Sequence, residues 1–332
     1  MNTKVRNSNI ELLRIIAMMF IVIWHISVHA QKGELDSHNY IIAFCTTGVN
    51  LFILISGYFG IKLTWQNLLT LISTVLFYSL ITNACKWLIT ETPPSIDDMK
   101  ELLVPIKESR WWFINCYFNL MLLSPIINIA LNKATDRQFK YIVGVLLFIS
   151  CISGFCFKNS INLNGYNTFH FITIYVLGNA IKKFHLPSRL STKQFSCTYI
   201  LSTLCIFALS FFASRISNYN NPLIVISALS LFCFFAKLDF KSKAVNYIAT
   251  FMLPVYLLQD SSTGQIIYKY LYQSGLKMDF QGAEYSSLII LYIIILLGSA
   301  FILDNIRRFL LNQPISTICK SLNKKANIFN HL

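Results

Sequence analysis

Charged residues are scarce in this sequence. Only 13% of the 332 residues are Asp, Glu, Lys or Arg, whereas 55% are hydrophobic. Soluble domains usually carry about a quarter charged residues, so this composition excludes an ordinary globular enzyme and predicts a multi-pass membrane protein. Acidic residues are especially few, 14 against 28 Lys and Arg, and the formal net charge is +14. In a membrane protein such an excess is typical of basic cytoplasmic loops, and because no basic run is interleaved with aromatics in a polar region, we expect no nucleic-acid partner.

The sequence also lacks any cysteine pattern that indicates a metal or disulfide site. The nine cysteines are odd in number, lie mostly in apolar stretches, and form neither a Cys-x-x-Cys pair nor a Cys/His cluster. We therefore expect small residues packed between helices, with no disulfide and no metal. Repeats of fixed period, Gly/Ser linkers and an appended soluble domain are absent as well. A single integral membrane domain over residues 1–332 is the resulting prediction.

Ten apolar stretches are the main positive feature, since about 20 apolar residues suffice to cross a bilayer as a helix. They lie near residues 10–29, 40–61, 66–89, 111–131, 141–157, 168–181, 195–214, 222–238, 247–268 and 285–305. The intervening segments on the side of the N-terminus hold about twice as many Lys and Arg as those on the other side. The positive-inside rule then predicts cytoplasmic termini. The expected fold is all-α, a helical bundle to about residue 305 followed by a basic cytoplasmic tail, 306–332.

The first of these stretches carries three ionisable residues. In "ELLRIIAMMFIVIWHI" they are Glu11, Arg14 and His25, and an ionisable group in a membrane span is by default a candidate functional residue. At about 100° per residue, the eleven steps from Arg14 to His25 make three turns plus roughly 20°, so both project from one face about 16 Å apart along the axis. Glu11 shares this face and can pair with Arg14. No small-x-small cleavage pattern follows, so we expect a retained helix rather than a signal peptide.

This spacing suits a cosubstrate with phosphates at one end and a reactive group at the end of a long arm. The arginine fork binds oxyanions and stays charged when buried, while a neutral buried histidine is a competent general base. Coenzyme A has this shape: its pyrophosphate would meet Arg14 while the pantetheine arm carries an acyl thioester toward His25. A structural alternative remains, in which Arg14 reaches the headgroups and pairs with Glu11 while His25 bonds a neighbouring helix. Their shared face favours the functional interpretation.

Together with three further motifs, this first helix resembles acyltransferase family 3, the membrane acyltransferases that modify bacterial surface polysaccharides. The family's first helix has an acidic residue three before an arginine, then ten residues, then a histidine. The other motifs are similar to "LFILISGYFGIK", "RWWFINCYFNLMLLSP" and "ATFMLPVYLLQD". They contain Ser56, Gly57 and Tyr58; Trp112, Phe113, Tyr117 and Pro125; and Gln259 and Asp260. The resemblance implies about ten helices in the cytoplasmic membrane of a bacterium.

Two positions depart from the family pattern. The late helix usually ends in a histidine where this chain has Gln259, followed by Asp260, and Arg110 replaces a histidine that many members carry before the Trp-Phe pair. We expect these differences to tune the acceptor, because family members differ in the sugar and in the acyl group they transfer.

The expected activity is therefore O-acetyl transfer from cytoplasmic acetyl-CoA to a hydroxyl of a capsular, exopolysaccharide or lipid-linked glycan, in contact with membrane lipids. His25 is the predicted base, and Glu11 orients Arg14. Predicted contacts are Arg14, Ser56 and Tyr58 for the donor, and Arg110, Trp112, Tyr117, Gln259 and Asp260 for the acceptor. Two alternatives stay open: a transporter of a glycan or lipid-linked sugar, and an acyltransferase with a lipid or small-molecule acceptor.

Other polar or small residues in the spans are expected to hold helices together. They are Gly57, Asn50 and His170, which we assign to packing or interhelical hydrogen bonds. Asp304 lies three and four residues before two arginines near the cytoplasmic end of the last span, so it can pair with one of them. His29, about one turn after His25, receives only a secondary role.

Overall fold

The computed structural model describes residues 7–32, 38–96, 99, 102, 111–158, 160–162 and 164–325. All regular secondary structure in this part of the chain is helical, which confirms the predicted all-α fold. The chain divides into two compact units. Unit 1 comprises Met1–Ser27, Leu35–Ile61 and Ile126–Met252, and unit 2 comprises Val28–Glu34, Lys62–Pro125 and Leu253–Leu332. The prediction of one membrane domain over the whole chain is separate from this division and stays a prediction.

Seven helical segments within the described residues are long and apolar enough to cross a membrane. They are Ser8–Ala30, Asn39–Phe59, Trp65–Thr90, Trp112–Lys133, Asp136–Cys156, Ser214–Ala236 and Ala283–Asn323. The other three predicted stretches also contain helices, but α8 (Thr168–Lys183) has 16 residues, α10 (Thr192–Ser210) is outside this set, and the ninth stretch is interrupted. The chain is thus a multi-pass membrane protein, while the count of ten spans and the cytoplasmic termini stay predictions.

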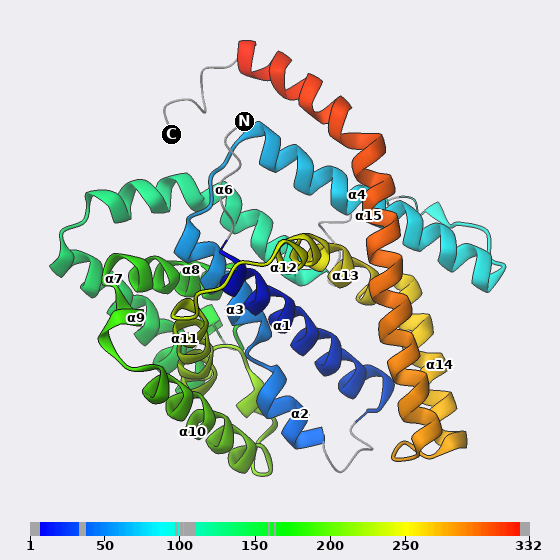
Figure 1. Cartoon of the computed structure of the whole chain (residues 1–332), viewed down its shortest axis with the longest axis horizontal. Coiled ribbons are helices and arrows are strands. Elements are labelled where there is room, and N and C mark those ends of the chain that lie inside the picture. Colours follow the sequence, from blue (N-terminus) through cyan, green and yellow to red (C-terminus); the bar gives the residue numbers. More distant parts are fainter. Residues whose placement is uncertain are drawn as a thin grey trace. The chain divides into compact units, whose positions relative to one another are not determined.

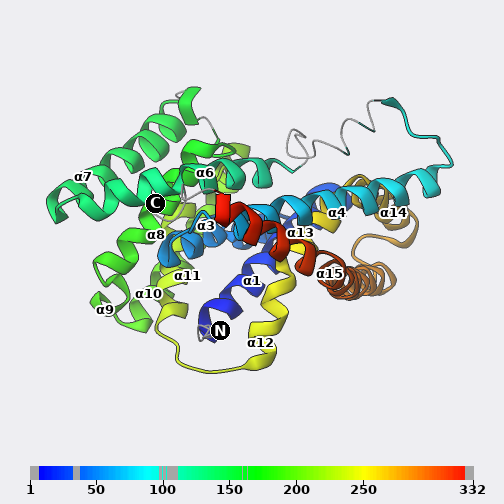
Figure 2. The same ribbon diagram turned by 90° about the horizontal axis from the view of Figure 1, so that it is seen from above.

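Unit 1 is built around α3 (Gly48–Phe59), which packs against α1 (Ser8–His25), α8 and α11 (Pro222–Ala236). Figures 1 and 2 both show α3 and α8 side by side. A Cβ atom at Gly57 would collide with the backbone of Tyr175 in α8, and one at Gly178 would lie 2.5 Å from the carbonyl oxygen of Leu54. Only residues without a side chain permit this approach, so the packing role predicted for Gly57 is confirmed.

Remaining helices of unit 1 complete the bundle. They are α2 (His38–Cys45), α7 (Asp136–Leu147), the π-helix η3 (Phe148–Cys156), η4 (Ser160–Asn162), α9 (Leu186–Arg189), η5 (Ser214–Ser217), α12 (Lys243–Ile248) and η6 (Ala249–Phe251). The N-terminus of α1 is fastened to this unit by two side chains. Asn9 Nδ2 donates to the carbonyl oxygen of Phe235 at 2.9 Å, and Ser8 Oγ accepts from the backbone N–H of Ser242 at 2.9 Å. These bonds fix the position of the helix that carries Glu11, Arg14 and His25.

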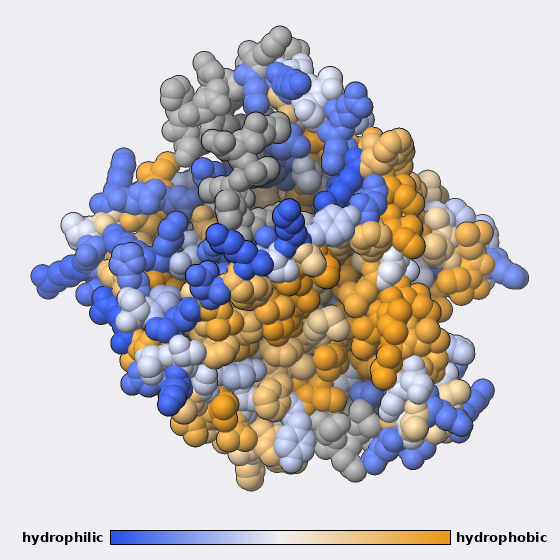
Figure 3. All heavy atoms as spheres, viewed as in Figure 1, coloured by the Kyte–Doolittle hydropathy of each residue, from blue (hydrophilic) through white to orange (hydrophobic). Residues whose placement is uncertain are grey.

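Unit 2 contains α4 (Trp65–Thr90), the first part of α6 (Trp112–Lys133), α13 (Met252–Gln259), α14 (Ser262–Met278) and the 43-residue α15 (Ala283–Lys325). Helix α15 packs against α4 and α14. Its outer side exposes Ile290, Leu291, Ile294, Ile295 and Ile302, and Figure 3 shows hydrophobic residues gathered over the middle of this helix. Such a surface is stable against lipid tails rather than water.

The ninth predicted stretch, residues 247–268, is an interrupted helix, and its crossing of the membrane stays a prediction. Helix α13 ends at Gln259, and α14 begins at Ser262 with the Ser261 hydroxyl accepting from the Gly264 N–H at 3.0 Å. A Cβ atom at Gly264 would collide with the carbonyl oxygen of Gln259, so the tight break depends on this glycine. The serine cap in "QDSSTG" is a local signal that hydropathy overlooks.

Candidate active site

Helix α1 places three ionisable side chains along one run of α-helix in unit 1. Because the helix is uninterrupted from Ser8 to His25, Arg14 and His25 keep the predicted shared face and an axial separation of about 16 Å. His25 is 7% exposed. The π-helical turn η1 (Ile26–Ala30) follows it directly, and such turns frequently occur at functional sites.

The predicted ion pair between Glu11 and Arg14 is confirmed, with an unusual geometry. Arg14 Nε lies 3.6 Å from Glu11 Oε2, which is close enough for attraction and too long for a hydrogen bond. Both atoms are buried, and neither makes a hydrogen bond within the described part of the chain. The Arg14 side chain is 31% exposed and the Glu11 side chain 9%. The carboxylate therefore attracts the guanidinium without using up its donors, which leaves Arg14 able to bind an oxyanion.

Ser56 and Tyr58 lie half-buried at the end of α3, next to α1 in the packing of unit 1. Ser56 Oγ donates to the carbonyl oxygen of Phe52 at 3.0 Å, and the Tyr58 ring lies 5.2 Å from the ring of Phe232. The hydroxyl oxygen of Ser56 can still accept a hydrogen bond from a ligand.

Backbone atoms just after α3 are held by a buried network. The N–H of Ile61 donates to Tyr175 Oη at 3.0 Å, Asn128 Nδ2 donates to the Ile61 carbonyl oxygen at 3.0 Å, and Tyr175 Oη donates to Asn128 Oδ1 at 2.7 Å. These hydrogen bonds hold the segment after Tyr58 against Asn128 of α6 and Tyr175 of α8.

A second group of candidate residues lies at the helix break of unit 2. Gln259 is fully buried and Asp260 is 7% exposed. Tyr256 Oη donates to Asp260 Oδ2 at 3.1 Å, and Tyr268 Oη donates to Gln259 Oε1 at 3.4 Å. Gln259 Nε2 is buried and finds no hydrogen-bond partner among the residues described. The His29 ring lies 5.6 Å from the Tyr268 ring.

Aromatic residues of α6 continue this group. The Phe113 ring lies 6.0 Å from Tyr117, stacked, and 5.6 Å from Tyr256. Trp112 contacts Phe113 edge to face at 6.2 Å. In unit 2, four of the five predicted acceptor residues thus lie near one another, because the contact between Phe113 and Tyr256 joins α6 to α13. The fifth, Arg110, falls outside the described residues.

Sequence reasoning missed Tyr256 and Tyr268. Tyr256 precedes Asp260 by four residues, a spacing at which side chains on a helix meet, so it was open to detection. Tyr268 reaches Gln259 across the break between α13 and α14, and no periodicity indicates that contact.

The packing assignments for Asn50 and His170 are confirmed. His170 Nε2 lies 2.9 Å from Asn50 Oδ1 and Nδ1 lies 3.1 Å from Ser150 Oγ, while Asn50 Nδ2 donates to the Tyr219 carbonyl oxygen at 3.0 Å. Both residues are fully buried. They join α3 to α8 and η3, as expected for polar groups inside a bundle.

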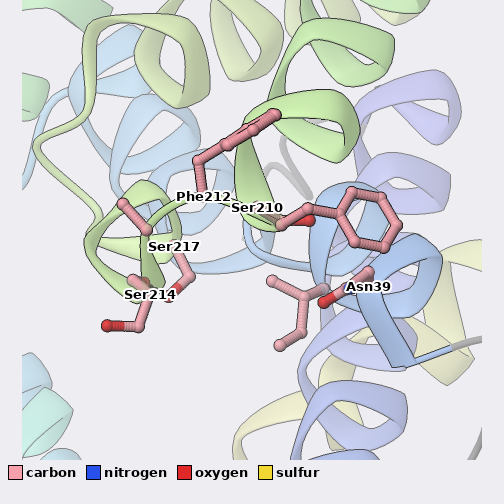
Figure 4. A pocket seen from close by; sticks show the side chains of 8 residues that line it. Asn39, Ser210, Phe212, Ser214 and Ser217 are labelled. Atoms are coloured by element: carbon pink, nitrogen blue, oxygen red, sulfur yellow. Dashed lines mark hydrogen bonds between the residues drawn. The ribbon is translucent and has the colours of Figure 1, made fainter.

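A cavity of about 300 Å³ lies elsewhere in unit 1, near the N-terminal end of α2 and the C-terminal end of α10. Figure 4 shows the side chains of Asn39, Ser210, Phe212, Ser214 and Ser217 around it. None of the residues predicted to bind acetyl-CoA, Arg14, Ser56 and Tyr58, lines this cavity.

Long apolar helices carrying buried ionisable side chains define the class as a multi-pass membrane protein with a polar site on its first helix. A family model described as an acyltransferase domain, that of acyltransferase family 3, matches residues 7–305. The chain belongs to this family, as its four motifs predicted, and is therefore an acyltransferase. Comparison with curated proteins and with solved structures gave no match.

Proposed function

We propose that this acyltransferase is an O-acetyltransferase of the bacterial cytoplasmic membrane. It moves the acetyl group of cytoplasmic acetyl-CoA to a hydroxyl of a capsular, exopolysaccharide or lipid-linked glycan. The observation that supports this most strongly is the polar face of α1, where Arg14 keeps hydrogen-bonding capacity at one end and the buried His25 lies about 16 Å away.

In this proposal Arg14 binds phosphate of the donor. Its guanidinium is attracted by Glu11 but not saturated by it, so Glu11 acts as a positioning residue. The planar fork of arginine matches a phosphate group better than a lysine ammonium does. The pantetheine arm then extends along α1 toward His25, with Ser56 and Tyr58 assigned to its binding.

The chemical step needs one base and no protein nucleophile. The His25 imidazole takes the proton of a sugar hydroxyl as that oxygen attacks the thioester carbonyl carbon, forming the new C–O bond. Collapse of the tetrahedral intermediate breaks the C–S bond, and the CoA thiolate leaves and is protonated by the imidazolium. General-base catalysis of this kind contributes about 10²- to 10⁴-fold in rate.

Acceptor recognition is assigned to Arg110, Trp112, Tyr117, Gln259 and Asp260. Aromatic rings suit the apolar faces of sugars, and amide and carboxylate groups suit their hydroxyls. A buried donor without a partner is costly, and Gln259 Nε2 is such a donor in the described structure. An oxygen of the bound sugar that accepts a hydrogen bond from Gln259 Nε2 would remove this unfavourable contribution.

The experiment uses purified protein in nanodiscs, with acetyl-CoA and an extract of the host's surface glycan. Release of free CoA is expected to depend on the glycan. Its rate should fall by at least about 10²-fold in His25→Ala. In Arg14→Ala the KM for acetyl-CoA should rise. His185→Ala and Arg137→Ala, at exposed positions of unit 1, are the matched controls. Wild-type protein that neither binds nor turns over acetyl-CoA while glycan export in cells depends on it would overturn the proposal in favour of a transporter.

A further inference from the structure

A group of charged side chains lies where the apolar part of α15 ends. Asp304 accepts hydrogen bonds from Arg307 Nε at 2.7 Å and from Arg308 Nε at 2.6 Å, so the predicted pairing is confirmed with both arginines. The side chains of Asp304, Arg307 and Arg308 are 1%, 6% and 31% exposed. These charges are therefore largely withdrawn from water, although the three side chains together carry one net positive charge.

The distance of this group from the start of α15 suits a position at a membrane surface. Asp304 follows Ala283 by 21 residues, which is about 32 Å of helix and close to the thickness of the hydrocarbon core. Figure 3 shows hydrophilic residues beyond the hydrophobic middle of the helix. A group at the surface of the hydrocarbon core would meet both lipid phosphates and phosphorylated solutes.

Tyr78 lies on α4, the helix that packs against α15, and its hydroxyl makes no hydrogen bond within the described residues. Helix α4 packs on α15, Tyr78 is fully buried, and Asp304, Arg307 and Arg308 are all close enough to act on it electrostatically. Tyr78 Oη and Arg307 Nη1 are buried and make no hydrogen bond to any described residue. Two donors near excess positive charge thus lack an acceptor among the described residues, which is unfavourable unless a ligand supplies one.

We propose that Arg307 and Tyr78, with Arg308 at the exposed edge, form a binding site for a phosphate ester at the membrane surface. An anionic oxygen would accept from Arg307 Nη1 and Tyr78 Oη and would balance the net charge of the group. Asp304 acts as a positioning residue, because it holds both arginines through their Nε atoms and leaves Arg307 Nη1 for the ligand. A phospholipid headgroup and a phosphate of coenzyme A both supply this chemistry. The inference does not depend on the acetyl-transfer reaction proposed above.

Calorimetric titration of the detergent-purified full chain tests the site with four probes in two matched pairs. CoA is compared with pantetheine, and dihexanoyl-phosphatidylglycerol with dihexanoylglycerol, so that each pair differs by the phosphate groups. The variants are Arg307→Gln and Tyr78→Phe, with Lys320→Gln as a control that removes one positive charge from an exposed position of α15.

The expected result is tighter binding of at least one phosphate-bearing probe than of its phosphate-free partner. Affinity for that probe falls about tenfold or more in Arg307→Gln and about threefold in Tyr78→Phe, while Lys320→Gln keeps wild-type affinity. An effect confined to phosphatidylglycerol identifies a lipid, and an effect confined to CoA identifies the cosubstrate. Tyr78→Phe deletes a hydroxyl that has no hydrogen-bond partner among the described residues, so this variant is expected to fold. It therefore tests the phosphate site even if Arg307→Gln fails to fold. Wild-type affinity for both phosphate-bearing probes in Tyr78→Phe would overturn the proposal.

Discussion

Two arginine–carboxylate pairs with the same spacing, Glu11–Arg14 in unit 1 and Asp304–Arg307 in unit 2, differ in their geometry. Arg307 Nε lies 2.7 Å from Asp304 in a hydrogen bond, whereas Arg14 Nε lies 3.6 Å from Glu11 and is not hydrogen-bonded to it. Asp304 also binds a second arginine. The same sequence pattern therefore gives a tight hydrogen-bonded cluster around a buried Asp304 in one helix and a loose pair without a hydrogen bond in the other. The spacing predicts that the charges meet, and burial decides how firmly they bind.

The largest expected difference between the pairs is in stability. Asp304→Asn leaves two arginines without their common carboxylate and is expected to lower the free energy of unfolding by about 3 kcal/mol, as for the loss of one partner from a buried ion pair. Glu11→Gln is expected to lower it by less than about 1 kcal/mol, because Arg14 is partly exposed. Thermal unfolding of both variants in one detergent measures this difference. Equal losses of stability would contradict the distinction between a tight and a loose pair.

A smaller effect is expected in substrate binding. Arg14→Lys keeps the charge but loses the planar fork, so the KM for acetyl-CoA should rise about tenfold with little change in kcat. Arg137→Lys, at an exposed position of α7, is the control with the same chemical change. Steady-state kinetics over a range of acetyl-CoA concentrations separate the two parameters. If kcat falls and KM does not, Arg14 acts on the reacting atoms rather than on the phosphates.

The smallest effect is expected when Glu11 is neutralised. Glu11→Gln should raise the KM for acetyl-CoA about threefold, since the loose pair contributes less than about 1 kcal/mol to holding the guanidinium in place. The same kinetic assay measures it, and the double variant with Arg14→Lys tests coupling. Additive effects in the double variant would show that Glu11 does not position Arg14.

Much of this structure was predictable from local patterns in the sequence. The apolar stretches predicted helices, and residues three or four apart predicted the pairs at Glu11 and Asp304, because both depend only on neighbours along one helix. The family motifs then identified the acyltransferase class.

Contacts between distant segments were not predictable in the same way. Hydropathy treated residues 247–268 as one span, because the break after Gln259 depends on a serine cap and on Gly264 rather than on polarity. The contact of Tyr268 with Gln259 follows from that break. Likewise, the spacing of Glu11 and Arg14 does not predict the 3.6 Å distance between Arg14 Nε and Glu11 Oε2, because that distance depends on packing within unit 1.

The π-helical turn Ile26–Ala30 has a consequence for how the first helix tolerates change. A π turn accommodates one more residue than an α turn, so it behaves as a single-residue insertion absorbed within a membrane crossing. Deleting one residue from it would convert the turn to α-helix, and the residues after it would keep their positions around the axis because the π turn had already accommodated the extra residue. Glu11, Arg14 and His25 all precede the turn and would keep their register. The first helix can thus lose a residue at this turn without changing the face that carries the three ionisable side chains.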